Sequence, residues 1–280
     1  MKIEKAEKLG LCFGVRRAIK LLQEAVDQYG EIETLGSLAH NRLLVETLAD
    51  LGAKPVNHLD EVRGRTLAIT THGTSPALLS EIENRRLHVI DTTCPIVGKA
   101  QNTARELAKA GLNVVIFGHA DHSEVKGLLG WTGEKGMAAL TTEQIDRSQE
   151  SLSRLGIISQ TTQTRPAFMD FVKQLLEIVG ADLREMRLVD TLCRVTQSQQ
   201  EAAIKLARKS QLMIVIGGSN SANVRHLVEI CSSVAETHLV ETADEINHSW
   251  FSGKHRVGVT AGASTPDQAV DELVARLGSL

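Results

Sequence analysis

The chain has 280 residues, of which 42% are hydrophobic, 23% charged and 3% aromatic, and its formal net charge at pH 7 is -3. This composition excludes a disordered chain and a strongly basic nucleic-acid-binding protein, and so few aromatic rings leave little surface for stacking unpaired bases. No apolar run approaches the roughly 18 residues that span a bilayer, and no apolar segment follows the charged residues among positions 1–5. We therefore expect a soluble, cytoplasmic protein without a membrane span or secretory signal.

The first third of the chain begins with a cysteine and a helical pattern. Apolar residues recur with helical spacing after Cys12, at Val15, Ala18, Ile19, Leu22 and Val26. Strand-like apolar segments follow, and two of them lead into polar loops, at residues 36–41 and 69–76. These loops contain His40 and His72, each shortly before another helical pattern.

The same order of elements returns twice. Cys94 and Cys193 each end a D-T-x-C motif, at residues 91–94 and 190–193, and each precedes a helical pattern. Polar loops follow at residues 118–124 and 158–166 in the second copy, and at 217–223 and 259–266 in the third. The nine loops thus form three triplets, each opened by a cysteine.

Strand, short polar loop and helix in repeated order predict an α/β fold, in which helices cover parallel sheets and ligands bind at the carboxyl ends of the strands. Three similar lobes would most simply surround a pseudo-threefold axis as a trefoil, with their loops facing a common centre. The predicted lobes are residues 13–94, residues 95–192, and residues 193–280 together with 1–12. The N-terminal segment joins the last lobe because Cys12 lies too early to follow a whole lobe.

Three equivalent cysteines predict a shared metal centre. A single such cysteine is usually a small buried hydrophobe, but three at helix starts, where the helix dipole lowers the pKa of a thiol, are suited to present thiolates at one point. Three thiolates fit either zinc with an open fourth position or a cubane iron–sulfur cluster with one free iron, and the spacing does not choose between them. The fourth cysteine, Cys231, shares an apolar helix face with Leu227 and is expected to pack in the core.

The remaining polar loop residues have the side chains of an anion site placed at helix starts. They are His40, His72, His119, His122, Thr161, Ser221, Asn223 and Ser264. Capping explains the hydroxyl and amide residues equally well, but histidine is a poor N-cap, so the histidines favour a ligand. Glu124 lies in a histidine-rich loop; it is either a catalytic acid or a first-turn carboxylate that favours the helix dipole.

Together these motifs resemble the 4-hydroxy-3-methylbut-2-enyl diphosphate reductase family. The matching segments are residues 10–15, 40–42, 91–95, 122–127, 159–162 and 259–264. The resemblance implies a trefoil around a 4Fe-4S cluster held by Cys12, Cys94 and Cys193. It also implies that Glu124 donates a proton with help from Thr161, and it assigns no role to His119. The diphosphate ligands that it implies are His40, His72, His122, Ser221, Asn223 and Ser264.

The implied reaction is the last step of the non-mevalonate isoprenoid pathway, in which two electrons remove an allylic hydroxyl to give isopentenyl and dimethylallyl diphosphate. A ferredoxin or flavodoxin would supply the electrons. Two positions depart from the family pattern, since Ala222 replaces a serine and Gln199 an arginine; we expect both changes to affect diphosphate affinity more than the chemistry. Two other functions stay open: a zinc hydrolase of a phosphorylated metabolite and a non-catalytic iron–sulfur redox sensor.

Overall fold

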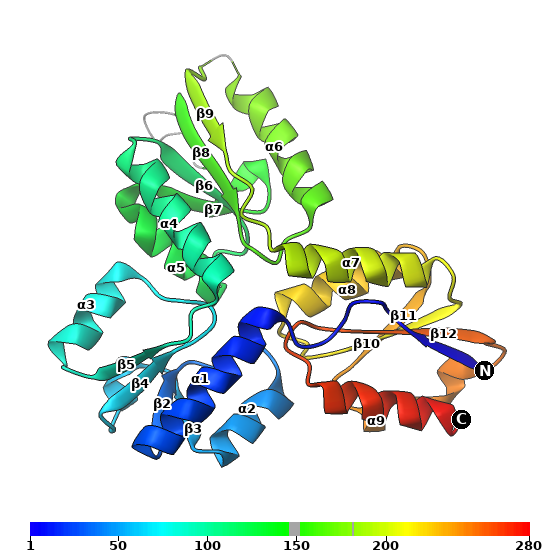
Figure 1. Cartoon of the computed structure of the whole chain (residues 1–280). Coiled ribbons are helices and arrows are strands. Elements are labelled where there is room, and N and C mark those ends of the chain that lie inside the picture. Colours follow the sequence, from blue (N-terminus) through cyan, green and yellow to red (C-terminus); the bar gives the residue numbers. More distant parts are fainter. Residues whose placement is uncertain (146–151, 181) are drawn as a thin grey trace.

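Three separate four-stranded sheets organise the chain in the computed structural model, which describes residues 1–145, 152–180 and 182–280. Every strand pair in these residues is parallel. The three lobes lie around a common centre as a trefoil (Figure 1). The prediction of an α/β trefoil is confirmed.

The first sheet has the strand order β3-β2-β4-β5. Its strands are β2 (Ile32–Leu35), β3 (Ala53–Val56), β4 (Thr66–Ile69) and β5 (His88–Asp91). The helices of this part of the chain are α1 (Phe13–Tyr29), α2 (Arg42–Asp50) and α3 (Pro76–Asn84), with the short 3-10 helix η1 (Leu59–Glu61).

The second sheet repeats this order as β7-β6-β8-β9. Its strands are β6 (Asn113–Phe117), β7 (Gly136–Ala139), β8 (Arg154–Ser159) and β9 (Glu185–Leu188). The accompanying helices are α4 (Pro95–Lys109), α5 (Ser123–Thr132) and α6 (Arg165–Val179), with η2 (Gly133–Lys135) and η3 (Thr142–Gln144).

The third sheet joins the two ends of the chain in the order β1-β12-β10-β11. Its strands are β1 (Lys2–Lys5), β10 (Leu212–Ile216), β11 (Glu236–Val240) and β12 (Arg256–Ala261). Its helices are α7 (Arg194–Ala207), α8 (Ala222–Ser232) and α9 (Asp267–Gly278), with η4 (Ala243–Glu245) and η5 (His248–Phe251). Both termini therefore lie in one lobe (Figure 1).

The inner strands of the sheets are rich in buried apolar residues because helices cover both faces of each sheet. In β10 all five side chains are buried, and they contribute to two apolar clusters, one with α9 and one with α7 and α8. A parallel strand covered on both faces reads as a continuous apolar run instead of an alternating pattern. The rigid sheets hold the strand-end loops that face the centre. No helix among the described residues is long and apolar enough to cross a membrane.

Candidate active site

The three cysteines occupy equivalent positions in the backbone. Cys12, Cys94 and Cys193 are the N-cap residues of α1, α4 and α7. Each cysteine N–H donates to a carbonyl two residues beyond the end of a strand: Cys12 to Ala263 (2.9 Å), Cys94 to Thr71 (3.1 Å) and Cys193 to Thr161 (2.8 Å). One hydrogen bond, repeated three times, thus fixes each helix start against a strand-end loop.

The D-T-x-C motif holds the backbone before two of these cysteines with side-chain hydrogen bonds. The Asp91 carboxylate accepts the Thr93 N–H, and Asp190 does the same for Leu192, so each aspartate closes a tight turn. The threonine hydroxyls donate back to strand-end carbonyls, Thr92 to Ile69 and Thr191 to Ser159. The motif therefore sets the position of the cysteine that follows it.

The loop before Cys12 is held by a different hydrogen bond. Gly10, two residues before the cysteine, has a positive φ of 74° that favours glycine, and its carbonyl accepts Nε2 of Gln199 at 2.8 Å. Gln199, the departure from the family pattern, therefore contacts the loop that carries Cys12. Gln199 does not line the central pocket, so the expectation that it affects diphosphate affinity has no direct contact to support it.

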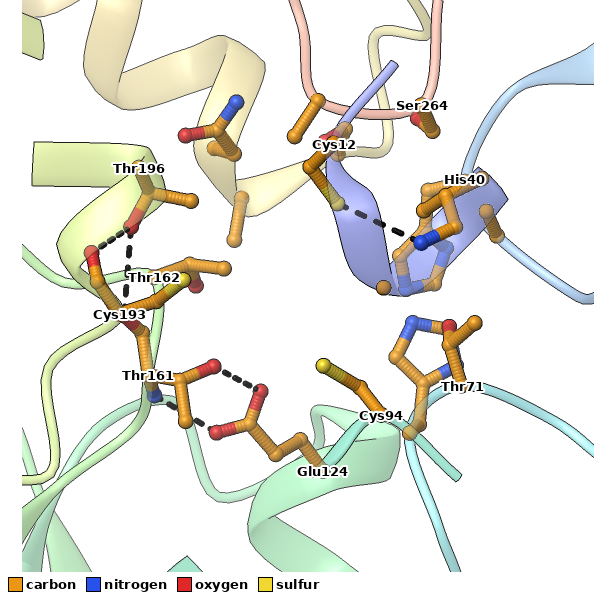
Figure 2. A pocket seen from close by; sticks show the side chains of 18 of the residues that line it. Cys12, His40, Thr71, Cys94, Glu124, Thr161, Thr162, Cys193, Thr196 and Ser264 are labelled. Atoms are coloured by element: carbon orange, nitrogen blue, oxygen red, sulfur yellow. Dashed lines mark hydrogen bonds between the residues drawn. The ribbon is translucent and has the colours of Figure 1, made fainter. Parts of the chain in front are cut away.

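The three thiols line one central pocket (Figure 2). Cys12 and Cys94 point into it, and a Cβ built on Gly14 would lie 2.6 Å from the Cys94 sulfur, so only glycine allows this approach of α1. Burial raises the pKa of Cys12 and Cys94, which corrects the expectation that the helix start lowers it. Desolvation of the thiolate outweighs the dipole in the free protein, and a bound cation would reverse that balance.

A cluster of three histidines forms another wall of the pocket. The ring centroids of His40, His72 and His122 lie 4.8 to 5.6 Å apart, and their ligand atoms lie within 4.8 Å of one another. Burial is the main cause that lowers the pKa of all three rings, to about 4 for His122. The free site therefore holds neutral imidazoles, which can bind a metal ion or donate hydrogen bonds to an anion.

Some side chains expected to bind a ligand also cap helices. Nδ1 of His122 accepts the Glu124 N–H at 3.1 Å, and the Ser221 hydroxyl accepts that of Val224 at 3.4 Å. The argument that histidine is too poor an N-cap to be explained by capping is therefore wrong for His122. The cap orients its ring, because it leaves only Nε2 for the pocket.

Asn223 stands out because the protein satisfies neither end of its amide. The side chain is 3% exposed and lines the pocket, yet its Oδ1 and Nδ2 have no hydrogen-bond partner in the described residues. Nε2 of His40 is also buried without a partner there. Buried polar groups are costly to leave unpaired, so these atoms indicate a ligand at this end. Ser264 lines the same pocket.

Glu124 is a buried carboxyl, and one residue donates hydrogen bonds to both of its oxygens. Thr161 donates its N–H to Oε1 (2.6 Å) and its hydroxyl to Oε2 (2.9 Å), and Glu124 is 2% exposed (Figure 2). Burial raises the pKa of Glu124 to about 7, although both bonds from Thr161 act to lower it. The residue thus holds a proton near neutrality, as a general acid requires.

A polar row on α7, absent from the predicted site, supports Thr161. The Thr196 hydroxyl donates to the Cys193 carbonyl at 2.9 Å and lies 3.5 Å from the Thr161 carbonyl, and the next two carbonyls accept side-chain amides, Thr162 from Gln200 and Gln163 from Gln197. Thr162 and Thr196 also line the pocket. The signal in the sequence is threonine and glutamine after Cys193, at positions of the helical pattern where apolar residues are the rule.

Two predicted residues lie apart from the pocket. Cys231 is fully buried in the apolar cluster of α7, α8 and β10, as expected for a core residue, and burial raises its pKa to about 12. His119 does not line the pocket; its N–H donates to Oε1 of Gln160.

Curated relatives match this chain over its whole length. A relative in Dehalococcoides mccartyi (strain CBDB1) is 43% identical over all 280 residues, which are 99% of that protein, and is named 4-hydroxy-3-methylbut-2-enyl diphosphate reductase. A relative of the same name in Geobacter metallireducens is 39% identical over 278 residues, covering 99% of this chain and 97% of that protein.

Two solved structures share the fold. One, described as this reductase and as the terminal enzyme of the non-mevalonate pathway, is 36% identical with a TM-score of 0.73 and full coverage of both chains. The Plasmodium falciparum reductase gives a TM-score of 0.91 at 24% identity, covering 98% of this chain and 86% of that one. The profile of the LytB protein family matches residues 3–278, and the chain belongs to that family.

Proposed function

We propose that the chain is a 4-hydroxy-3-methylbut-2-enyl diphosphate reductase. It removes the allylic hydroxyl with two electrons and two protons, releasing water and giving isopentenyl or dimethylallyl diphosphate. The observation that carries this proposal is that one pocket brings together three equivalent cysteines, a buried carboxyl with a raised pKa, and buried polar side-chain atoms that lack hydrogen-bond partners in the described residues. Each group matches one requirement of the reaction: the cysteines hold a group that supplies electrons, the carboxyl supplies a proton, and the polar side chains bind the diphosphate.

The donor set fits a 4Fe-4S cluster. Three thiols line the pocket at equivalent helix starts, and Gly14 provides the space beside Cys94 that a side chain would fill. Cys12, Cys94 and Cys193 would hold three irons. The bound cluster supplies the electrons and a Lewis-acidic iron for the substrate oxygen.

The polar wall binds the diphosphate. Asn223 brings an amide without a partner, and the Ser221 and Ser264 hydroxyls lie on the same pocket. Neutral His40, His72 and His122 donate hydrogen bonds to the anion, and its negative charge raises their pKa. Holding the diphosphate fixes the short allylic chain over the cysteine end, and such positioning can supply several kcal/mol of the barrier.

Glu124 protonates the departing hydroxyl. The raised pKa keeps its proton available near neutrality, and the carboxyl is buried on the pocket wall. The Thr161 hydroxyl orients the carboxyl and helps to relay the proton. General acid catalysis of this kind contributes about 10²- to 10⁴-fold.

Three further points belong to the proposal. The lobe boundaries are residues 13–94, 95–192 and 193–280 with 1–12, since each of these parts contributes the strands of one sheet.

A ferredoxin or flavodoxin delivers the electrons. The location is cytoplasmic, because cluster-binding thiols need a reducing compartment.

Anaerobic purification with iron and sulfide quantitation, followed by turnover of the allylic diphosphate with a chemical reductant, tests the proposal. Four irons, matching acid-labile sulfide and water-releasing turnover would support it. Zinc without sulfide would support the hydrolase, for which the histidine cluster offers a second ligand set. A cluster without diphosphate binding or turnover would support the redox sensor.

A further inference from the structure

Each sheet has a crevice between two adjacent strands whose chain connections run in opposite directions. In the first sheet β2 continues to β3 and β4 continues to β5, so β2 and β4 lie side by side where the strand order reverses. Open α/β sheets bind ligands at this point, outside the carboxyl ends of the strands. The equivalent pairs in the other two sheets are β6 with β8 and β10 with β12.

One glycine marks this crevice in every lobe. It directly follows the inner strand, and its N–H donates to the last carbonyl of the neighbouring strand. These hydrogen bonds join Gly36 to Val56 (2.7 Å), Gly118 to Ala139 (3.1 Å) and Gly217 to Val240 (3.0 Å). Because the same bond recurs at each glycine, the three crevices can be compared directly.

Side chains fill the crevice in two lobes and leave it open in the first. A Cβ built on Gly118 would lie 2.8 Å from the Cβ of Gln160, and one on Gly217 would lie 2.7 Å from a valine methyl of α8. A Cβ on Gly36 would meet no other described residue within 4 Å. Thr70 is the equivalent of Gln160, since each directly precedes the carbonyl that accepts a cysteine N–H. The shorter threonine leaves the first crevice unfilled.

The open crevice continues into a groove of about 490 Å³ at the seam of the first two lobes. Pockets that hold small molecules typically have volumes of about 300 to 1,000 Å³. The described lining comes mainly from the ends of β2 and β4, the loops that follow them, and the first turn of α5, and we call it the seam groove. Its wall is held across the seam, where α3 meets α5 (Figure 1), because Trp131 and Gln101 both donate to the Thr74 carbonyl, at 2.9 and 3.3 Å.

The lining of the seam groove has an apolar part and a polar part. Leu35, Ile69 and Leu78 supply the apolar part, and Leu35 and Leu78 are only partly buried. Lys126 is exposed, and apart from the histidines it is the only ionisable side chain in the described lining, which contains no carboxylate. A cation without a carboxylate beside it favours an anion, and the apolar part favours a hydrocarbon chain.

The seam groove adjoins the candidate diphosphate ligands. His40 and His72 line both the groove and the central pocket. Thr70, which lines only the groove, places its hydroxyl 3.4 Å from Nδ1 of His72. The two cavities therefore share imidazole rings, and an occupant of the groove would contact the histidines that face the central pocket.

We propose that the seam groove is a second binding site, for an organic diphosphate with a short hydrocarbon chain. The diphosphate binds at Lys126, and the chain packs against Leu35, Ile69 and Leu78. The choice of ligand rests on the proposed function, whose products combine these two chemical parts. The groove itself and its difference from the filled crevices of the other lobes do not depend on that function.

Two variants of the holoenzyme remove the proposed site in different ways. Thr70→Gln places in the first lobe the side chain that fills the equivalent crevice of the second lobe. Lys126→Gln removes the cation at nearly constant size. Lys109→Gln is the matched control, because Lys109 is an exposed lysine at the end of α4 and outside the groove. None of these three residues lines the central pocket.

Anaerobic calorimetric titration with isopentenyl diphosphate counts the sites. We expect the wild type and Lys109→Gln to bind two equivalents per chain, and Thr70→Gln to bind one. Lys126→Gln should weaken the second site by about tenfold or more, the effect of losing one hydrogen bond to a charged group. Inorganic diphosphate should bind the groove less tightly than isopentenyl diphosphate, because it has no hydrocarbon chain to bury.

A single equivalent bound by the wild type at millimolar ligand would overturn the proposal, as would a second equivalent that is unchanged in both groove variants. If Thr70→Gln loses its cluster, Lys126→Gln decides alone, and an unaltered second-site affinity in that variant overturns the proposal. Wild type that binds two equivalents but does not turn over the allylic diphosphate with a chemical reductant would support the groove site and refute the proposed function.

Discussion

The two ends of the central pocket are built in opposite ways. At the cysteine end, hydrogen bonds fix the backbone. Three equivalent bonds join a cysteine N–H to a carbonyl, and the threonines of the two D-T-x-C motifs donate to strand-end carbonyls. At the polar end equivalent loops of the three lobes carry different side chains, and Asn223 and His40 keep buried atoms without partners in the described residues. The difference separates a site preorganised to hold a resident group from one that a transient ligand completes.

The cysteine end should fail completely when one ligand is lost. Replacing Cys12, Cys94 or Cys193 with serine should abolish the cluster, because each thiol lies at an equivalent helix start on the pocket. Iron and sulfide content and the visible absorption spectrum measure this loss. Cys231→Ser is the matched control and should keep the cluster, since Cys231 is packed away from the pocket; cluster loss in that variant alone would contradict the assignment.

Between the two ends, Glu124→Gln should retain the cluster and substrate binding but lose about 10²- to 10⁴-fold in turnover, because the amide keeps the shape without a transferable proton. The assay is anaerobic turnover with a chemical reductant at matched cluster content. If Glu124 only favoured the helix dipole, stability would change by up to about 1 kcal/mol and the rate would stay near wild type. A rate within about threefold of wild type would remove Glu124 from the mechanism.

At the polar end, Asn223→Ala should raise KM or the substrate Kd by about 10- to 100-fold and leave cluster content unchanged. The magnitude corresponds to one or two hydrogen bonds to a charged group, at about 1.5–3 kcal/mol. Calorimetric titration with the substrate measures it. An unaltered Kd would show that the unpartnered amide serves no ligand, and the contrast between the two ends would lose its main support.

The pH dependence should follow Glu124. With a pKa raised to about 7, the carboxyl is protonated below that pH, so kcat should fall as pH rises through it, by about tenfold per unit once the acid is mostly ionised. Thr161→Val removes a hydrogen bond that lowers this pKa, so the falling limb should move to higher pH. Thr161→Ser keeps the hydroxyl and should leave the limb in place; a limb that moves equally in both variants would exclude the hydroxyl as the cause.

The smallest effect is expected for Ala222→Ser. Ala222 lines the pocket beside Asn223 and is 2% exposed, so the new hydroxyl can reach a bound anion but must first be desolvated. We expect substrate affinity to improve by up to about 1.5 kcal/mol, which a competitive titration with inorganic diphosphate would detect. Unchanged or weaker affinity would mean that the polar end is complete without this hydroxyl.

The sequence by itself determined the α/β class and the helix start beside each cysteine. Both follow from local signals, namely the order of strand, polar loop and helix and the repeated D-T-x-C motif, and the same logic placed Cys231 in the core. Periodicity and turn chemistry act over a few residues, so they can be read without knowledge of the contacts between lobes.

Only the tertiary structure decided the state of the side chains at the centre. The thiol pKa is raised where the helix dipole alone predicts a lower value, because burial of Cys12 and Cys94 is a property of the assembled lobes. The support of Thr161 by α7, the contact of Gln199 with the Cys12 loop and the raised pKa of Glu124 all join residues far apart in the chain. Desolvation and long-range hydrogen bonds exist only after folding, so no local pattern encodes them.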